Sequence, residues 1–380
     1  MNIPLDPAAI TCDWLTHALR DSKLLSQDRN EHVVDFEMEV IGEGAGFMGE
    51  IIRMNLSLSS AETNSPTSMI LKIPTTSKNR QVGQSMGIYE REIRFYKELQ
   101  PRVNVRTPAF FYGAMEQTPD PAQGLAILRF LNRMPIWLFW IVFRLLNWFG
   151  SRKQLGFVLL IEDLGHLRVG DQVAGCSSGD AKRALNTMAS LQTRFWQSQT
   201  LTDLLWIVPF ELLTKITQVF YLQALPKYLT ANKDQLSYRE KQLLEWLKVN
   251  AVELMNKLSN RPYTLLHGDF RLDNIFFDDE NDDVVLMDWQ SPGCGPAGLD
   301  LSYFLSASMA ADVTDQEMDQ LIEYYRCQLA ENGVEISNEQ MRWDYEAGML
   351  VVLLRVIPAE HQDVLNLGDD RGHDLVITWI

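Results

Sequence analysis

Residues 265–274 read LLHGDFRLDN, and residues 284–289 read VVLMDW. The first stretch contains the pattern H-x-D-x-x-x-x-N, from His267 through Asp269 to Asn274, and the second places Asp288 at the end of an apolar strand. Phosphoryl transfer uses such a set: one carboxylate accepts or orients the proton of the attacking hydroxyl, while an Asn and a second Asp hold Mg²⁺ against the phosphates. Polar loop residues that only satisfy turns are the less favoured alternative. The two stretches therefore indicate phosphoryl transfer.

The spacing of the two stretches has a structural explanation. Short apolar runs at 275–277 and 284–287 predict two strands, joined by the acidic turn 278–283. In such a hairpin Asn274 begins one strand and Asp288 ends its partner, so both side chains emerge at the same end. Asp269 lies on the loop just before them.

The rest of the chain divides into a β-rich and a helical part. Alternating apolar residues at 34–40 and 52–58 and an apolar run at 69–73 predict an antiparallel meander. A helix over 88–99 and short strands at 110–112 and 157–161 follow. From about 180 to 259, and again after the hairpin to residue 380, the apolar spacing is mostly helical. The predicted fold is α+β with two lobes.

One lysine and one glutamate in the first part have unusual positions. Lys72 shares the parity of Ile70 in an apolar strand, and Glu92 falls on the apolar face of the helix over 88–99, whereas Glu90 is expected on its solvated side. A buried ammonium is costly unless it is paired, so Glu92 is its natural partner. An edge lysine and a solvated glutamate are the alternative.

Four segments resemble a known family. They are EIRFY at 92–96, IEDL at 161–164, the loop 267–274, and MDWQ at 287–290 leading into GLDLSYFL at 298–305. Together they resemble the ecdysteroid kinase-like (CHK kinase-like) family of the aminoglycoside phosphotransferase and choline kinase superfamily, which shares the protein-kinase-like fold.

The resemblance implies a bilobal fold and a set of site residues. The N-lobe, with an antiparallel β-sheet, would bind the nucleotide in residues 1–163, and a mainly helical C-lobe in 164–380 would carry the catalytic loop, the metal site and the acceptor site. ATP and Mg²⁺ are the implied cofactors. It implies Asp269 as the catalytic base, with Asn274 and Asp288 as Mg²⁺ ligands. Lys72 and Glu92 would be the pair that orients the ATP phosphates. The hinge whose backbone bonds the adenine would contain Glu162 and Leu164, and Asp300 would brace the catalytic loop. His267 is expected to hold the loop.

The Gly-rich turn between the first two strands is a candidate phosphate loop. Gly44 and Gly46 could let backbone N–H groups approach the phosphates closely. A Gly-rich hairpin is on its own more often only a turn, and its position between the strands favours the phosphate loop.

Composition excludes several classes of protein. The net charge of −16 argues against a nucleic-acid partner, because phosphate backbones are bound through an excess of Lys and Arg. Four cysteines without C-x-x-C spacing indicate neither a zinc site nor a disulfide framework. The N-terminus lacks the pattern of a signal peptide, so the cytoplasm is the expected location.

An apolar segment at 135–149 departs from the family pattern. A helix there would be about 22 Å long, shorter than a bilayer core of about 30 Å, and Arg144 interrupts it. A buried helix, a dimer face, a wall of a lipophilic acceptor site and a helix on a membrane surface are the alternatives, and the membrane surface is not favoured.

The sequence thus predicts an ATP-dependent kinase acting on a hydroxyl of a small molecule. A non-catalytic nucleotide- or ligand-binding kinase-like protein, associated with a membrane surface or not, is the alternative. The identity of the acceptor alcohol and the oligomeric state are left open.

Overall fold

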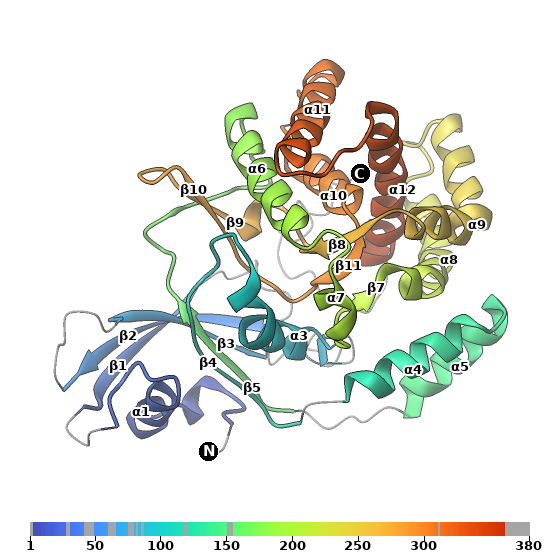
Figure 1. Ribbon diagram of the computed structural model, residues 1–380. Helices are drawn as coiled ribbons and strands as arrows, with labels where there is room; N and C mark the ends of the chain where they lie inside the picture. Colours follow the sequence, from blue (N-terminus) through green and yellow to red (C-terminus); the bar gives the residue numbers. More distant parts are fainter. Residues whose placement is uncertain are drawn as a thin grey trace.

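The computed structural model describes residues 3–27, 31–41, 49–59, 66–74, 80, 83–84, 87–117, 120–149, 155–310 and 312–361, without the side chains of 143, 146–149, 360 and 361. A five-stranded antiparallel sheet forms the N-terminal part, in the order β1-β2-β3-β5-β4 (Figure 1). Its strands are β1 (Val33–Ile41), β2 (Gly49–Leu58), β3 (Ser68–Pro74), β4 (Phe110–Met115) and β5 (Phe157–Glu162). The predicted meander is therefore confirmed.

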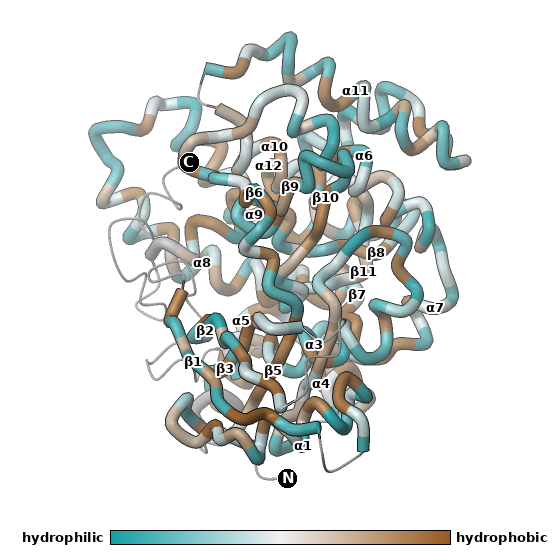
Figure 2. The backbone as a smooth tube through the Cα atoms, turned by 90° about the vertical axis from the view of Figure 1, so that its left-hand side faces the viewer, coloured by the Kyte–Doolittle hydropathy of each residue, from teal (hydrophilic) through white to brown (hydrophobic). Residues whose placement is uncertain are grey.

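The two faces of this sheet pack against different helices. On one face, α1 (Cys12–Asp21) buries Leu15 and Ala18 against β2, β3 and β5. The other face contacts α3 (Ile88–Arg94), which continues as the π-helical turn η2 (Phe95–Leu99). Since alternate residues of a strand face opposite sides, Lys72 points with Ile70 toward α3. Figure 2 shows the apolar character of β5, which is buried on both faces up to Ile161.

The C-terminal part is mainly helical and contains two small sheets (Figure 1). Its helices are α6 (Ser178–Arg194), α7 (Gln199–Asp203), α8 (Thr214–Ala231), α9 (Tyr238–Ser259), α10 (Gly298–Ser308), α11 (Asp315–Glu331) and α12 (Asn338–His361). One sheet has the order β10-β9-β6, from Asp283–Leu286, Ile275–Asp278 and Arg168–Val169, and the other has the order β7-β11-β8, from Val208–Pro209, Gly293–Pro296 and Tyr263–Leu266. The fold is thus α+β and kinase-like, as predicted.

A helical hairpin is inserted between β4 and β5. It consists of α4 (Pro121–Asn132) and α5 (Ile136–Phe149), and it extends from the sheet toward α8 of the C-terminal part (Figure 1). Leu131 and Phe139 are buried against Val219 of α8. Lys215 of α8 donates to the backbone carbonyls of Asn132 and Met134, at 2.5 Å each, where α4 ends. Within the described residues, no helix is long and apolar enough to cross a membrane.

Candidate active site

A buried lysine joins the two parts of the molecule. Nζ of Lys72 on β3 lies 2.6 Å from Oε1 of Glu92 on α3, and 2.8 Å from Oδ1 of Asp288, which follows β10. The Lys72 and Glu92 side chains are 8 % and 4 % exposed, so solvent screens the pair little. The predicted partnership of Lys72 and Glu92 is present, and Asp288 completes it from the far side.

The electrostatics of this triad follow from two anions sharing one cation. Burial by itself would lower the pKa of Lys72, but the carboxylates of Asp288 and Glu92 outweigh it and raise that pKa. Burial raises the pKa of Glu92, with Asp288 adding to the rise against the opposing effect of Lys72. Both pKa values can rise because Lys72 interacts with two carboxylates, whereas Glu92 interacts with a single ammonium that also pairs with Asp288. Lys72 therefore stays charged.

The loop after β8 is held by Asp300 of α10. Its carboxylate accepts the backbone N–H groups of His267 at 2.8 Å and Gly268 at 3.0 Å. Gly268 has φ +78°, and a Cβ there would lie 2.0 Å from the carbonyl oxygen of Ser291, so only glycine fits. These contacts fix the backbone immediately before Asp269.

His267 is buried inside this loop. Its Nε2 donates to the carbonyl of Met287 at 2.9 Å, while Nδ1 is buried without a hydrogen-bond partner among the described residues. Burial lowers the pKa of the ring, which favours the neutral form. The ring ties the loop to the strand that leads to Asp288, as a structural residue would.

Asp269 is surrounded by donors from three places. Its Oδ1 accepts from the Tyr303 hydroxyl of α10 at 2.9 Å, and its Oδ2 accepts from Nδ2 of Asn274 at 2.9 Å. Nε of Arg271 lies 3.4 Å from Oδ1. Burial would raise the pKa of Asp269, but Arg271 and these hydrogen bonds outweigh it, so the pKa lies below its usual range. The group is an ionised carboxylate at neutral pH and a weak base.

The fit of a divalent cation depends on Asn274 and Asp288. Nδ2 of Asn274 donates to the backbone carbonyl and to Oδ2 of Asp269. The amide oxygen of Asn274 is therefore available as a metal ligand. Asp288 has φ +63° and accepts from Lys72 and Gln290. Among the described residues, no group of three or more His, Cys, Asp or Glu side chains is arranged to hold a metal ion. One carboxylate and one amide oxygen fit Mg²⁺, which completes its shell with phosphate oxygens and water.

The predicted hairpin positions differ slightly from the observed ones. Asn274 ends the 3₁₀ turn η5 (Leu272–Asn274), one residue before β9, and Asp288 follows β10 by two residues. The backbone N–H of Met287 donates to the carbonyl of Asn274 at 3.0 Å, so the two residues are held together beyond the strand ends.

The expected adenine hinge lies where β5 leaves the sheet. The Glu162 carboxylate accepts the backbone N–H of Ala109 at 2.9 Å, and Leu164 is buried. Asp163 between them accepts from Arg53 at 2.8 Å and from Ser68 at 2.5 Å. The strand-to-helix connection is thus well anchored. Gly44 and Gly46 lie outside the described residues.

One expectation was wrong, and several site residues were missed. Glu90 is buried rather than solvated, because Nε of Arg94 lies 2.6 Å from its carboxylate and neutralises it. Tyr303 was quoted in the family segment without a role, although its position three residues after Asp300 puts both on one face of α10. The spacing of residues in the sequence does not predict the contacts of Arg271 with Asp269 or of Gln290 with Asp288.

Comparison with solved structures shows which fold this chain shares. A protein from Ralstonia eutropha JMP134 assigned as an aminoglycoside phosphotransferase is 12 % identical, with 96 % of each chain covered and a TM-score of 0.50. An amicoumacin kinase in complex with AMP-PNP, Ca²⁺ and Ami is also 12 % identical, with 96 % of this chain and 91 % of that chain covered and a TM-score of 0.50. A choline kinase from Cryptosporidium parvum is 10 % identical, with 90 % and 88 % covered and a TM-score of 0.47. At these identities the likeness shows the fold, which is that of the aminoglycoside phosphotransferases.

The family itself follows from the sequence match. The model of the ecdysteroid kinase-like family matches residues 43–108 and 205–337, together more than half of the chain. The protein belongs to the ecdysteroid kinase-like family. No curated protein matches the chain at a significant level.

Proposed function

We propose that this protein is an ATP- and Mg²⁺-dependent kinase that transfers the γ-phosphoryl group to a hydroxyl of a small molecule. The observation that carries the proposal is the convergence of Lys72, Glu92 and Asp288 into one buried triad, with Asp269 and Asn274 hydrogen-bonded beside it. These side chains come from positions between residues 72 and 288 and form two groups, which the backbone hydrogen bond from Met287 to Asn274 holds next to each other. A nucleotide would bind between residues 1–163 and residues 164–380, in a protein working in the reducing cytoplasm.

The roles follow from charge and position. Lys72, held by Glu92, would bind the phosphates of ATP, and Asn274 with Asp288 would hold Mg²⁺. Bound there, Mg²⁺ would neutralise the phosphate charge. Asp269 would accept a hydrogen bond from the acceptor hydroxyl and align its oxygen with the γ-phosphorus. Its lowered pKa makes it an orienting group first, which suits a loose transition state in which the hydroxyl proton leaves late.

The surroundings of Asp269 favour neutral or anionic acceptors. Arg355 of α12 is exposed, donates to the carbonyl of Gly268 at 3.0 Å, and lies over the Tyr303 ring, 5.4 Å from its centroid. Tyr303 in turn contacts Asp269. A hydroxyl approaching Asp269 past Tyr303 therefore passes a guanidinium, which repels cationic substrates and attracts anionic or polar neutral ones. We therefore propose an alcohol without positive charge as the acceptor.

A screen of alcohols for ADP release tests this function. Sterols, sugars and hydroxy acids form one set, and choline and aminoglycosides form the cationic set. We expect Mg²⁺-dependent turnover with a member of the first set. Arg355→Glu should raise the relative rate with cationic alcohols. Release of ADP with choline or aminoglycosides only would leave a kinase but refute the uncharged acceptor.

One variant separates the kinase from a non-catalytic nucleotide-binding protein. Asp269→Asn keeps the shape of the side chain, and its amide can still donate to the Tyr303 oxygen while its oxygen accepts from Asn274. Binding of a non-hydrolysable ATP analogue should therefore persist, while kcat falls by about 10²–10⁴-fold. If the wild-type protein binds the analogue but no alcohol in the screen elicits ADP release above background, the non-catalytic alternative is favoured.

A further inference from the structure

The α4–α5 hairpin exposes large apolar side chains that its contact with α8 does not cover. On α5 these are Trp137, Ile141 and Leu145, with Trp137 64 % exposed, and on α4 they are Ile127 and Phe130, with Phe130 60 % exposed. A single exposed apolar residue is ordinary, but five on two consecutive helices call for an explanation. The buried-helix alternative for 135–149 therefore holds for only one side of α5 among its described side chains.

The exposed residues of α5 form a single stripe. Trp137, Ile141 and Leu145 follow one another at four-residue spacing, so they lie along one face of the helix. Phe139, which is fully buried against Leu131 and Val219, is two residues from both Trp137 and Ile141 and so points about 200° away. The stripe therefore faces away from the body of the protein.

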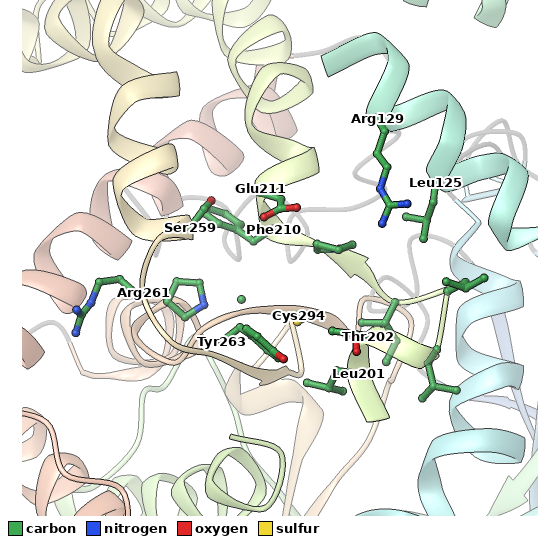
Figure 3. A pocket seen from close by; sticks show the side chains of 16 residues that line it. Leu125, Arg129, Leu201, Thr202, Phe210, Glu211, Ser259, Arg261, Tyr263 and Cys294 are labelled. Carbon is green, nitrogen blue, oxygen red and sulfur yellow. The ribbon is translucent and has the colours of Figure 1, made fainter. Parts of the chain in front are cut away.

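Two of the exposed apolar side chains lie on α4, away from its pocket side. Leu125 and Arg129 point into a pocket that α4 forms with α7, β8 and β11 (Figure 3). Ile127 and Phe130 are not among the residues that line this pocket, and both are exposed. Ile127 and Phe130 thus point away from this pocket, although Leu131, four residues after Ile127 and on the same face, is buried against Val219 where α4 ends.

The charge of the hairpin differs in sign from that of the chain. From Pro121 to Phe149 there is no Asp or Glu, and the charged residues are Arg129, Arg133 and Arg144. The whole chain carries −16. Arg133 and Arg144 are exposed, and Arg144 lies over the Trp140 ring, 5.2 Å from its centroid. A partner with an apolar interior and a negatively charged surface complements this combination.

We propose that the outer face of the α4–α5 hairpin binds an anionic lipid membrane surface. The helices would lie in the plane of the interface, with Trp137, Ile141 and Phe130 among the acyl chains near the headgroups and the arginines at the phosphates. Tryptophan is favoured at this depth. The 14-residue α5 is about 21 Å long, too short to span a core of about 30 Å, so it binds from one side. This inference is independent of phosphoryl transfer.

Vesicle sedimentation of the full-length protein tests the proposal. The probes are vesicles of phosphatidylcholine and phosphatidylserine in equal amounts, and vesicles of phosphatidylcholine alone. We expect binding to the anionic vesicles that weakens with added salt. Trp137→Ser combined with Ile141→Ser should weaken it about tenfold or more, because two apolar anchors are lost. Trp246→Ser is the matched control, because Trp246 is also exposed, 46 %, but lies on α9.

A second pair of variants tests the electrostatic part without touching the apolar stripe. Arg133→Gln combined with Arg144→Gln should weaken binding to anionic vesicles about tenfold. These surface changes leave the buried contacts of the hairpin intact, so they decide the matter even if the apolar variants misfold.

Three outcomes would overturn the proposal. They are no sedimentation with anionic vesicles, sedimentation equally weakened by Trp246→Ser, and sedimentation that neither hairpin pair changes. If ultracentrifugation also shows a dimer that Trp137→Ser with Ile141→Ser dissociates, without vesicle binding, the face belongs to a second copy of the chain.

Discussion

Replacing Glu92 by glutamine tests whether the Lys72 triad works as proposed. Glu92→Gln keeps the shape of the side chain and a hydrogen-bond acceptor for Nζ of Lys72. It removes one of the two carboxylate charges that pair with Lys72. Removing one partner of a buried ion pair commonly costs about 3–5 kcal/mol of folding free energy. Here Asp288 still pairs with the ammonium, and the raised pKa of Glu92 shows that its charge is costly to bury. We therefore expect a smaller loss of about 1–2 kcal/mol, near that of a charged hydrogen bond.

The effect on activity should exceed the effect on stability. Without Glu92 the Lys72 ammonium is drawn to Asp288 alone, so it no longer lies between the two carboxylates. A loss of about 2 kcal/mol in transition-state stabilisation corresponds to about a 30-fold fall in kcat/KM for ATP. The assay is ADP release with the alcohol that the screen identifies, beside unfolding in urea.

Glu90→Gln is the matched control. Glu90 lies on the same helix, is also buried, and also forms a 2.6 Å ion pair, but with Arg94. Its loss should cost a similar folding free energy of about 1 kcal/mol and leave kcat/KM within about twofold. Equal falls in kcat/KM for the two variants would refute the reasoning, because α3 would then matter only as a packed helix.

Three further predictions concern the loop and the metal site. Asp288→Asn should bind the ATP analogue but need much more Mg²⁺ for half-maximal ADP release; an unchanged Mg²⁺ titration would contradict the metal assignment. Because the pKa of Asp269 is lowered by folding, its stabilising contribution is present above the unfolded value of 3.8 and is lost as pH falls through the folded value. The stability difference between wild type and Asp269→Asn should therefore shrink as pH falls below 3.8 in urea unfolding; a constant difference would contradict this. Gly268→Ala should destabilise the protein by about 2 kcal/mol or more, since the new Cβ meets the Ser291 carbonyl at 2.0 Å and φ is +78°, whereas Gly124→Ala, with open space around it, should not.

Local sequence patterns predicted much of the fold and part of the candidate active site. The alternation at 52–58 and the apolar run at 69–73 predicted β2 and β3, and the parity of Ile70 and Lys72 predicted the face on which the lysine lies. The spacing of Glu92 on its helix predicted its partner. These predictions succeed because side-chain direction in a strand or helix depends only on position along the element.

Burial and long-range pairing were less predictable. Glu90 was expected in solvent because Arg94 follows it at helical spacing, yet the pair is buried as a unit, which only the surrounding structure determines. The helices from about residue 180 onward were predicted as a type but not in their arrangement, and α4 was not predicted at all. In particular, nothing in the sequence placed the insertion 121–149 against α8.

By itself, the sequence supplied the residues on which the proposed chemistry rests: the H-x-D-x-x-x-x-N loop, Asp288, Lys72 and Glu92. The contact of Lys72 with Glu92 was predicted, but only the tertiary structure showed the contacts of Lys72 with Asp288 and of Asp269 with Tyr303, because these join residues far apart in the chain. The tertiary structure also decided which side of α5 is buried. An apolar segment has the same composition whether it packs on the protein core or on a surface outside the protein. Only the packing of α5 against α8 shows which of its side chains stay exposed.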